Sequence, residues 1–233
     1  MKREMLHLAK RAIKATPLYW IYSKVGEHFQ RKLRTVREKQ EARLPNTSLS
    51  QAHVESCELL ADRSVLLSRL PNNGVVAEIG VSEGDFSSEI LSRTDPDTLH
   101  LIDWWKTSGH SHGFEMVQSR FESEIEKEKV EVHRGLSTDV ADHFPANYFD
   151  WIYIDTDHSY ETTRDELQKY APKVKSGGII AGHDYMMANW KGAYRYGVVE
   201  AVHEFCECHD WKLIYLTADV NENRSFAIQS MEA

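Results

Sequence analysis

The stretch that decides the fold reads FDWIYIDTDHSY at residues 149–160 and, after a polar helical segment, KVKSGGIIAGHDY at residues 173–185. Residues 151–154 and 179–181 have the length and the β-branched content of buried strands. Polar residues follow at once: Asp155, Asp157 and His158 after the first run, His183 and Asp184 after the second. Ligand-binding groups in open α/β sheets collect beyond the carboxyl ends of the strands. We therefore expect these five side chains to line one edge of one crevice.

Strand-like and helix-like segments alternate outward from this stretch. Seven strands are expected, at residues 75–79, 98–102, 130–133, 151–154, 179–181, 211–216 and 225–228. Helices are expected between most of them, a long one over 114–127 included, and one helix over 48–70 precedes them. Such alternation predicts an α/β fold with a doubly wound, mostly parallel, Rossmann-like sheet. Because no helix separates the last two strands, we expect them to form an antiparallel hairpin.

The charge of the chain is distributed unevenly. Residues 1–45 carry twelve of the 28 Lys and Arg residues but only four of the 36 Asp and Glu residues. Their pattern predicts a helix that Pro17 interrupts. We therefore divide the chain into a basic helical extension, residues 1–45, and an acidic α/β domain, residues 46–233.

Three roles remain open for this basic extension. It could pack on the α/β domain of its own chain. It could instead pack on a second subunit, and the protein would then be a homo-oligomer. It could lie on an anionic membrane surface through Tyr19, Trp20 and its basic residues. The third role, binding nucleic acid, is disfavoured because the acidic domain would repel phosphates, so no nucleic-acid partner is expected.

The three cysteines, Cys57, Cys206 and Cys208, make no even disulfide framework, and no stretch approaches the roughly 20 apolar residues of a membrane span. Both features favour a cytoplasmic protein, with peripheral membrane contact left open.

A glycine turn follows the first strand of the predicted sheet. Glu78, Gly80, Ser82 and Gly84 stand in the sequence EIGVSEG, where Ser82 replaces the second glycine of the dinucleotide fingerprint. Acidic residues in this turn repel phosphate, so a cationic or neutral ligand fits better. Asp103 ends the second strand, where an acid accepts hydrogen bonds from a ribose diol. A purely structural turn is the alternative.

The motif E-x-G-x-x-x-G with an acid ending the second strand resembles class I S-adenosylmethionine-dependent methyltransferases, over about residues 50–230. The segments IDTDHSYE and GGIIAGHDY resemble the branch of sugar and macrolide O-methyltransferases and, more distantly, the catechol type. The resemblance implies that the glycine turn lines the methionine end of the cofactor, with Asp103 at the ribose and Ser137 at the adenine. The implied cofactor-binding set is Glu78, Gly80, Ser82, Gly84, Asp103 and Ser137.

Asp155 and Asp184 offer the carboxylate oxygens that a hard cation such as Mg²⁺ prefers. His183 stands where some relatives carry an acid, so Mn²⁺ or another transition ion also fits. Asp157 is an alternative third ligand, although Asp157 or Ser159 could instead cap the next helix.

The chemistry that these residues imply is methyl transfer to a hydroxyl group. Asp155 belongs to the expected catalytic set because a bound metal lowers the pKa of the substrate hydroxyl, and His158 or His183 is the candidate base. We expect a metal-assisted O-methyltransferase acting on a sugar, a glycan or a glycosylated small molecule. The alternatives are methylation of a catechol or another small molecule by the same fold, and a non-catalytic nucleoside-binding protein.

Overall fold

The computed structural model describes residues 17–106, 112–189, 194–219 and 222–231. Contacts divide the chain into a unit that ends at Leu44 and a unit that begins at Pro45. In the first unit, α2 (Pro17–Glu41) is a single helix. The helix expected before Pro17 lies outside the described residues. No described helix is long and apolar enough to cross a membrane.

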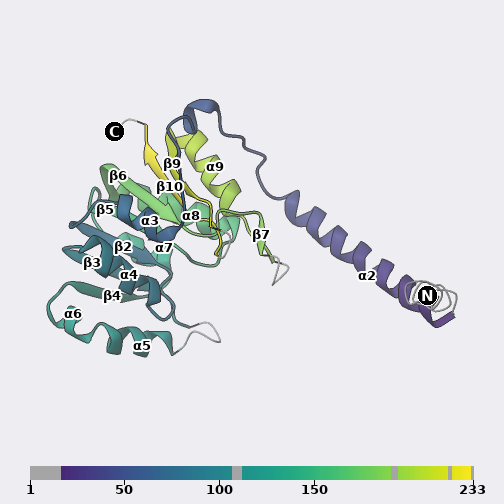
Figure 1. The fold of residues 1–233 in the computed structure, drawn as a ribbon, viewed down its shortest axis with the longest axis horizontal. Coiled ribbons are helices and arrows are strands. Elements are labelled where there is room, and N and C mark those ends of the chain that lie inside the picture. The colour runs from purple at the N-terminus through teal and green to yellow at the C-terminus, as the bar shows by residue number, and fades with distance from the viewer. Residues whose placement is uncertain (1–16, 107–111, 190–193, 220–221, 232–233) are drawn as a thin grey trace, which may run out of the picture. The chain divides into compact units, whose positions relative to one another are not determined.

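The second unit is built on one twisted sheet (Figure 1). Its strands are β1 (Glu58–Leu60), β2 (Val75–Ile79), β3 (Thr98–Asp103), β4 (Val130–Arg134), β5 (Phe149–Ile154), β6 (Val174–Gly182), β9 (Trp211–Thr217) and β10 (Phe226–Ser230). They lie in the order β1-β9-β10-β6-β5-β2-β3-β4. Only β10 runs antiparallel to its neighbours within this sheet, β6 and β9. The predicted doubly wound, mostly parallel sheet with an antiparallel last hairpin is confirmed.

Helices cover both faces of this sheet. One face packs against α3 (Arg63–Arg69), α4 (Asp85–Thr94) and α5 (Gly113–Arg120), and its core includes Leu67, Ile90 and Val117. The other packs against α7 (Ser137–Val140), α8 (Tyr160–Tyr170) and α9 (Val198–His209), with Leu167 and Val202 in its core. Three short 3₁₀ helices lie at Gln51–His53, Ala141–His143 and Ala171–Lys173. Buried β-branched and aromatic side chains on both faces explain why the central strands read as continuous apolar runs.

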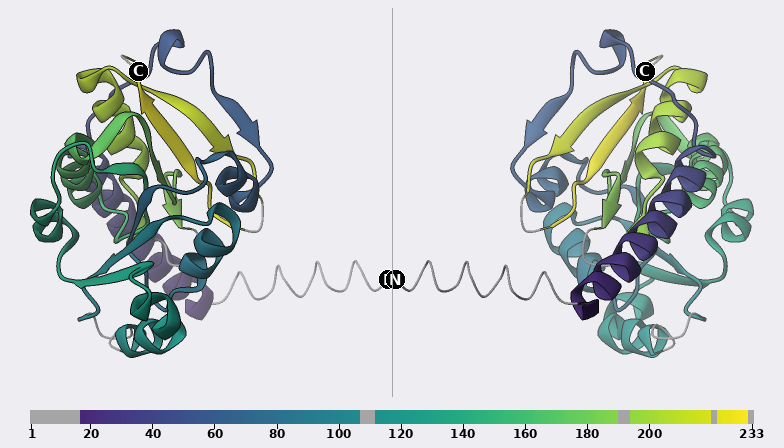
Figure 2. Two further views of the ribbon diagram at one scale, coloured as in Figure 1. Left: turned by 90° about the vertical axis from the view of Figure 1, so that its left-hand side faces the viewer. Right: turned by 90° about the vertical axis from the view of Figure 1, so that its right-hand side faces the viewer.

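The sheet has eight strands, whereas the sequence predicts seven. The prediction of one helix over residues 48–70 is wrong, because Glu58–Leu60 pairs in parallel with β9 as the edge strand β1 (Figure 2). Asp62 then begins a new helix, its side chain accepting a hydrogen bond from the backbone N of Val65 at 2.9 Å. The helical periodicity therefore holds only from Arg63 onward.

The helix expected over residues 114–127 is also divided. It forms α5 and α6 (Glu122–Glu126), which meet at Phe121. Phe121 is buried and has a non-helical φ of −109°. The break turns the Phe121 ring toward the core, where it packs beside Gly84 at the start of α4.

The order of the strands around β2 and the turn after β5 determine where the polar residues lie. β2 lies between β3 and β5, so the chain moves outward in opposite directions on the two sides of β2. This is the topological switch point at which ligands bind in open α/β sheets. At the end of β5, Ser159 caps α8 by accepting from the backbone N of Thr162, so the expected cap is confirmed.

Candidate functional site

A cavity of about 890 Å³ opens beyond the carboxyl ends of β2, β3 and β5, a volume ordinary for a small-molecule site. It brings together eight of the residues singled out from the sequence: Glu78, Gly80, Ser82, Asp103, Ser137, Asp155, Asp157 and His158. His183 and Asp184 lie directly behind His158. Gly84 is not among the lining residues.

The glycine turn that follows β2 needs a glycine at Gly80. Gly80 has a φ of +93°, and a Cβ there would lie 2.0 Å from the carbonyl oxygen of Asp155. The missing side chain therefore lets the turn after β2 touch the end of β5. Gly84 has a φ of +82° and is the N-cap residue of α4, where an added Cβ would lie 2.8 Å from the Phe121 ring. Its small size serves helix packing.

Asp103 holds the same turn in place. One carboxylate oxygen, Oδ2, accepts hydrogen bonds from the backbone N of Val81 and of Ser82, each at 2.9 Å. The other, Oδ1, accepts from the backbone N of Trp105, also at 2.9 Å. The indole of Trp105 in turn donates to the carbonyl oxygen of Ser82 at 2.7 Å. Asp103 thus fixes the cavity wall.

Two buried carboxyl groups border the cavity. Burial raises the pKa of Glu78 to about 8, although Ser87 donates a hydrogen bond to it. Burial likewise raises the pKa of Glu166 to about 7, although Ser137 and Thr156 donate to its two oxygens at 2.6 Å and 2.9 Å. Glu166 therefore links Ser137 on α7 to the end of β5.

Four of the five polar residues that follow β5 and β6 lie close together. The Nδ1 atom of His158 lies 2.9 Å from Oδ2 of Asp184 and 3.9 Å from Oδ1 of Asp155. The Nδ1 atom of His183 lies 3.7 Å from Oδ2 of Asp155 and 3.6 Å from Oδ1 of Asp184. Asn223 also donates to Asp184.

The pKa values of the two carboxyl groups in this cluster shift in opposite directions. Burial raises the pKa of Asp155, and the adjacent Asp184 carboxylate adds to the rise. Burial alone would raise the pKa of Asp184 too, but hydrogen bonds from His158 and His183 hold it well below its usual range. Burial alone would lower the pKa of His158, but the bond to Asp184 outweighs this and raises it. The strongest pair in the cluster is therefore His158 with Asp184.

The backbone at this pair is also unusual. His158 has a φ of +61° and Asp184 a φ of +57°, in the left-handed region that residues other than glycine rarely adopt. Strain of this kind persists where the surrounding structure holds it and gathers at functional sites.

Asp157, considered above as an alternative ligand, is used locally. Its carboxylate accepts from the backbone N of Ser159 at 3.0 Å and from the hydroxyl of Thr162 at 2.9 Å. Both contacts stabilise the first turn of α8, as a helix cap does.

Sequence reasoning missed several residues of the cavity, Arg63 and Glu166 among them. Arg63, at the start of α3, places its guanidinium 4.2 Å from the centre of the Phe86 ring and 3.2 Å from Glu222. No local sequence pattern predicts a role for Arg63, because only the tertiary fold brings α3 to the cavity. Glu166 had a signal: Thr163, Leu167 and Tyr170 show that position 166 lies on the buried face of its helix.

The segment after β6 approaches the cluster from outside. The two-residue strands β7 (Ala188–Asn189) and β8 (Tyr194–Arg195) pair with each other. Tyr196 follows and packs edge-on against the His158 ring, with the ring centres 4.9 Å apart. Gly197 donates its backbone N–H to the carbonyl oxygen of His158 at 2.9 Å. The Tyr196 ring therefore stands beside His158.

Comparison with known proteins agrees with this architecture. Residues 77–185 match a family model described as "Methyltransferase domain". No curated protein sequence matches the chain.

Solved structures share the fold at low sequence identity. An O-methyltransferase from Bacillus cereus in complex with SAH has a TM-score of 0.53 and 17% identity, covering 84% of this chain and 88% of that one. A putative rRNA methylase from Clostridium thermocellum has a TM-score of 0.55 and 13% identity, covering 71% and 92%. A putative methyltransferase from Streptococcus mutans in complex with SAH has a TM-score of 0.53 and 11% identity, covering 74% and 100%. At such identities the likeness shows the fold alone.

The family match, the order of the strands and the cavity at the switch point agree with one another. Residues 77–185 match the model of a methyltransferase domain, and the sheet that contains them has the fold of the solved methyltransferase structures named above.

Proposed function

We propose that this protein is an S-adenosylmethionine-dependent O-methyltransferase that methylates a hydroxyl group of a sugar, a glycan or a glycosylated small molecule. The observation that carries the proposal is the position of His158: it lines the cavity of the methyltransferase domain while Asp184 holds its Nδ1 from behind. The choice of a sugar acceptor rests on the resemblance of residues 154–161 and 177–185 to sugar and macrolide O-methyltransferases.

The charge of the cavity suits the proposed methyl donor. When bound, S-adenosylmethionine supplies a methyl group that its cationic sulfonium makes electrophilic. Seven acidic residues line the wall, against the single guanidinium of Arg63. Two of them adjoin the glycine turn: Glu83 lies within it, and the carboxylate of Asp103 accepts hydrogen bonds from its backbone. Arg63 gives the same wall one guanidinium, the partner that a donor's amino-acid carboxylate requires. We propose that Asp103 and Ser137 contact the ribose and the adenine, with Glu166 orienting the Ser137 hydroxyl.

His158 is suited to remove the proton from the acceptor hydroxyl. With Nδ1–H donating to Asp184, the second ring nitrogen, Nε2, carries the lone pair that accepts a proton. Asp184 then stabilises the imidazolium that forms, as an orienting carboxylate does in other acid–base pairs. General base catalysis by a positioned imidazole contributes about 10²–10⁴ in rate.

A divalent ion is an alternative occupant of the same cluster. Asp155, His158 and Asp184 each offer one ligand atom, and these atoms lie within 4.8 Å of one another. Two carboxylate oxygens suit Mg²⁺, and the imidazole nitrogen suits Mn²⁺ or a softer ion. Such an ion would take the place of the His158 proton and would lower the pKa of a bound hydroxyl. His158 would then be a ligand, and His183 would be the remaining base candidate.

One set of assays tests the proposal. Titration calorimetry should show that the purified protein binds S-adenosylhomocysteine, and a labelled methyl donor should label sugars or glycans in preference to catechols and to RNA. Loss of labelling with EDTA and its recovery with Mg²⁺ or Mn²⁺ would favour the ion, whereas unchanged labelling would favour the His158–Asp184 pair. His158→Asn tests the base itself, and His209→Asn, which changes an exposed histidine of α9, is its matched control. Binding of S-adenosylhomocysteine without labelling of any hydroxyl acceptor would contradict O-methyl transfer.

We further propose that α2 contacts an anionic membrane surface. Val25, Phe29, Leu33 and Val36 recur at helical spacing and are exposed in the described structure. Basic residues surround this stripe, among them Lys24, Arg31, Arg34 and Arg37. An apolar stripe with basic flanks is typical of helices that lie in a membrane interface.

A further inference from the structure

We propose that His100, Glu131 and His133 form a binding site for a divalent transition-metal ion of the Zn²⁺ type, separate from the methyltransferase cavity. His100 lies on β3 and the other two lie on the neighbouring edge strand β4. His100 pairs directly with Glu131 across the ladder, and His133 follows two residues after Glu131. Because side chains alternate along a strand, all three project from the same face of the sheet. None of the three lines the cavity.

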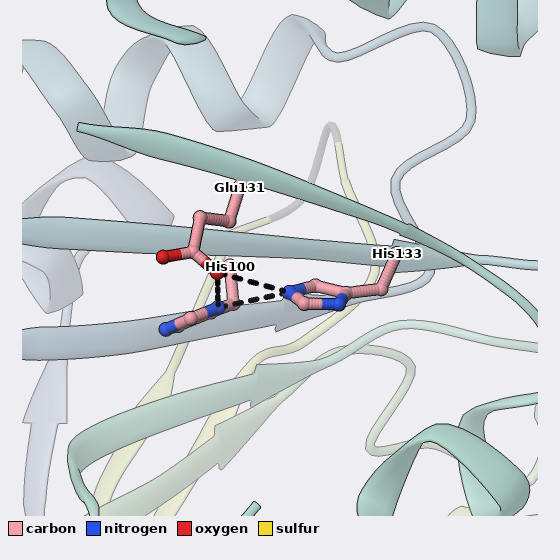
Figure 3. Close-up of side chains that lie close together, drawn as sticks. All are labelled: His100, Glu131 and His133. Atoms are coloured by element: carbon pink, nitrogen blue, oxygen red, sulfur yellow. Dashed lines mark hydrogen bonds and ion pairs between the residues drawn. The ribbon is translucent and has the colours of Figure 1, made fainter. Parts of the chain in front are cut away.

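The distances between the three ligand atoms suit one ion. Figure 3 shows the side chains pointing toward one another, with lines that join Nδ1 of His100, Nε2 of His133 and a carboxylate oxygen of Glu131. The two nitrogens lie 2.9 Å apart. The Oε2 atom of Glu131 lies 3.5 Å from Nδ1 of His100 and 3.8 Å from Nε2 of His133. Atoms that each lie about 2.0–2.2 Å from a common Zn²⁺ are separated by roughly 3–4 Å.

The surroundings of His100 resemble the outer shell of a metal site. Its side chain is buried, and its second nitrogen, Nε2, lies 3.2 Å from the hydroxyl oxygen of Tyr148. Phe144 and Phe149 contact the ring edge-on and fix its orientation. A histidine ligand usually donates its other N–H to such a partner, which fixes the tautomer that leaves the ligating nitrogen unprotonated. On the solvent side, about half of the Glu131 side chain is exposed, which gives an ion a way in.

The three side chains are of the types that bind a divalent cation, two imidazoles and one carboxylate. Burial lowers the pKa of His100 to about 4, with the neighbouring His133 adding to the effect, and burial also lowers the pKa of His133. An imidazole binds a metal ion through an unprotonated ring nitrogen. The Glu131 carboxylate faces both rings, whose facing nitrogens lie 2.9 Å apart. An ion between the three groups would bind both nitrogens and the carboxylate together.

Such an ion would act as a clamp at the edge of the sheet. β4 has β3 as its only strand neighbour among the described strands, and Gly135–Ser137, which leads to the cavity, follows β4 directly. A bond from His100 to both Glu131 and His133 through one ion would tie the edge strand to the sheet. Because the ion binds the folded chain, it should also raise the thermal stability of the protein.

Zn²⁺ titration of the purified full-length protein tests the proposal. We expect one tight site per chain, together with a rise in the melting temperature. His133→Gln and Glu131→Gln should each weaken Zn²⁺ binding at least tenfold and abolish the rise in melting temperature. Tyr148→Phe removes only the outer partner of His100 and should weaken binding about 10–100-fold. With Co²⁺ in place of Zn²⁺, the visible spectrum of the bound ion should vanish in His133→Gln.

Two controls separate this cluster from other places where Zn²⁺ could bind. Asp184→Asn alters the cluster behind the cavity, and Cys208→Ser removes an exposed thiol. Both variants should keep the tight site. Circular dichroism spectra without metal show whether each variant is folded, and the exposure of Glu131 makes Glu131→Gln the safest of the set. Wild-type Zn²⁺ affinity in both His133→Gln and Glu131→Gln, loss of the site in Asp184→Asn or Cys208→Ser, or no tight site in the wild type would overturn the proposal.

Discussion

The buried Glu166 should make the stability of this protein depend on pH in a way that one substitution removes. The pKa of Glu166 rises from its ordinary value of 4.5 to about 7 because the carboxyl group is buried. An acid with a higher pKa in the folded than in the unfolded chain binds its proton more tightly when folded. The contribution of Glu166 to stability is therefore lost as the pH rises from about 4.5 to about 7.

The size of the effect follows from the shift. Each pKa unit corresponds to about 1.4 kcal/mol, so ionised Glu166 destabilises the fold by about 3 kcal/mol above pH 8 relative to pH 4. The amide in Glu166→Gln cannot ionise, and it can still bond the hydroxyls of Ser137 and Thr156. The unfolding free energy of the variant minus that of wild type should therefore rise by about 3 kcal/mol from pH 4 to pH 8.

Urea denaturation at about pH 4, 6 and 8.5 measures this difference directly. Glu161→Gln, an exposed position on the same helix, is the matched control and should follow wild type at each pH. If the unfolding free energies of wild type and Glu166→Gln changed in parallel across the series, Glu166 would not be the buried, proton-binding group described here.

Three further predictions concern the cavity wall and the extension. Gly80→Ala should destabilise the protein by about 2 kcal/mol or more in chemical denaturation, because its Cβ would meet the carbonyl of Asp155 at a positive φ. Gly26→Ala should not destabilise the protein, because an added Cβ there meets nothing within 4 Å. Equal destabilisation by the two substitutions would contradict the close contact between Gly80 and Asp155. Asp103→Asn should lower the free energy of unfolding by about 1–3 kcal/mol and weaken S-adenosylhomocysteine binding in calorimetry, since three backbone N–H groups lose a carboxylate acceptor. Wild-type stability and wild-type binding would refute the role of Asp103 in the turn. Deleting residues 1–44 should abolish sedimentation with anionic vesicles while sparing methyl transfer to a soluble acceptor. Undiminished vesicle binding would refute the membrane contact, and a smaller assembly in analytical ultracentrifugation would instead indicate a subunit interface.

Much of the fold could be predicted because its central strands carry their own signal. Residues 151–154 and 179–181 are buried on both faces, so they are apolar throughout and end sharply at polar residues. The edge strand β1 has no such signal. It is three residues long and only Leu60 is buried, so its leucines merge with the helical pattern of α3. Its strand character comes from the backbone of β9, which no local pattern contains.

The same difference separates the predicted and the missed site residues. Asp155, His158 and Asp184 directly follow strands, so the topology of the sheet brings them together. Arg63 reaches the cavity only because α3 packs against α4, which is a property of the tertiary structure. The spacing of Glu131 and His133 was a usable signal, since two ligands on one face of a strand lie two residues apart. Their partner His100 is 31 residues away, and only the pairing of β3 with β4 identifies it.

The central claim is that His158, held by Asp184 at the edge of the methyltransferase cavity, removes the proton from the acceptor hydroxyl. The most direct test is the turnover number of His158→Asn with an identified acceptor, measured together with its affinity for S-adenosylhomocysteine. The account predicts a fall in kcat of about 10²–10⁴ with unchanged affinity for S-adenosylhomocysteine, while His209→Asn retains wild-type values. Wild-type turnover by His158→Asn would contradict it.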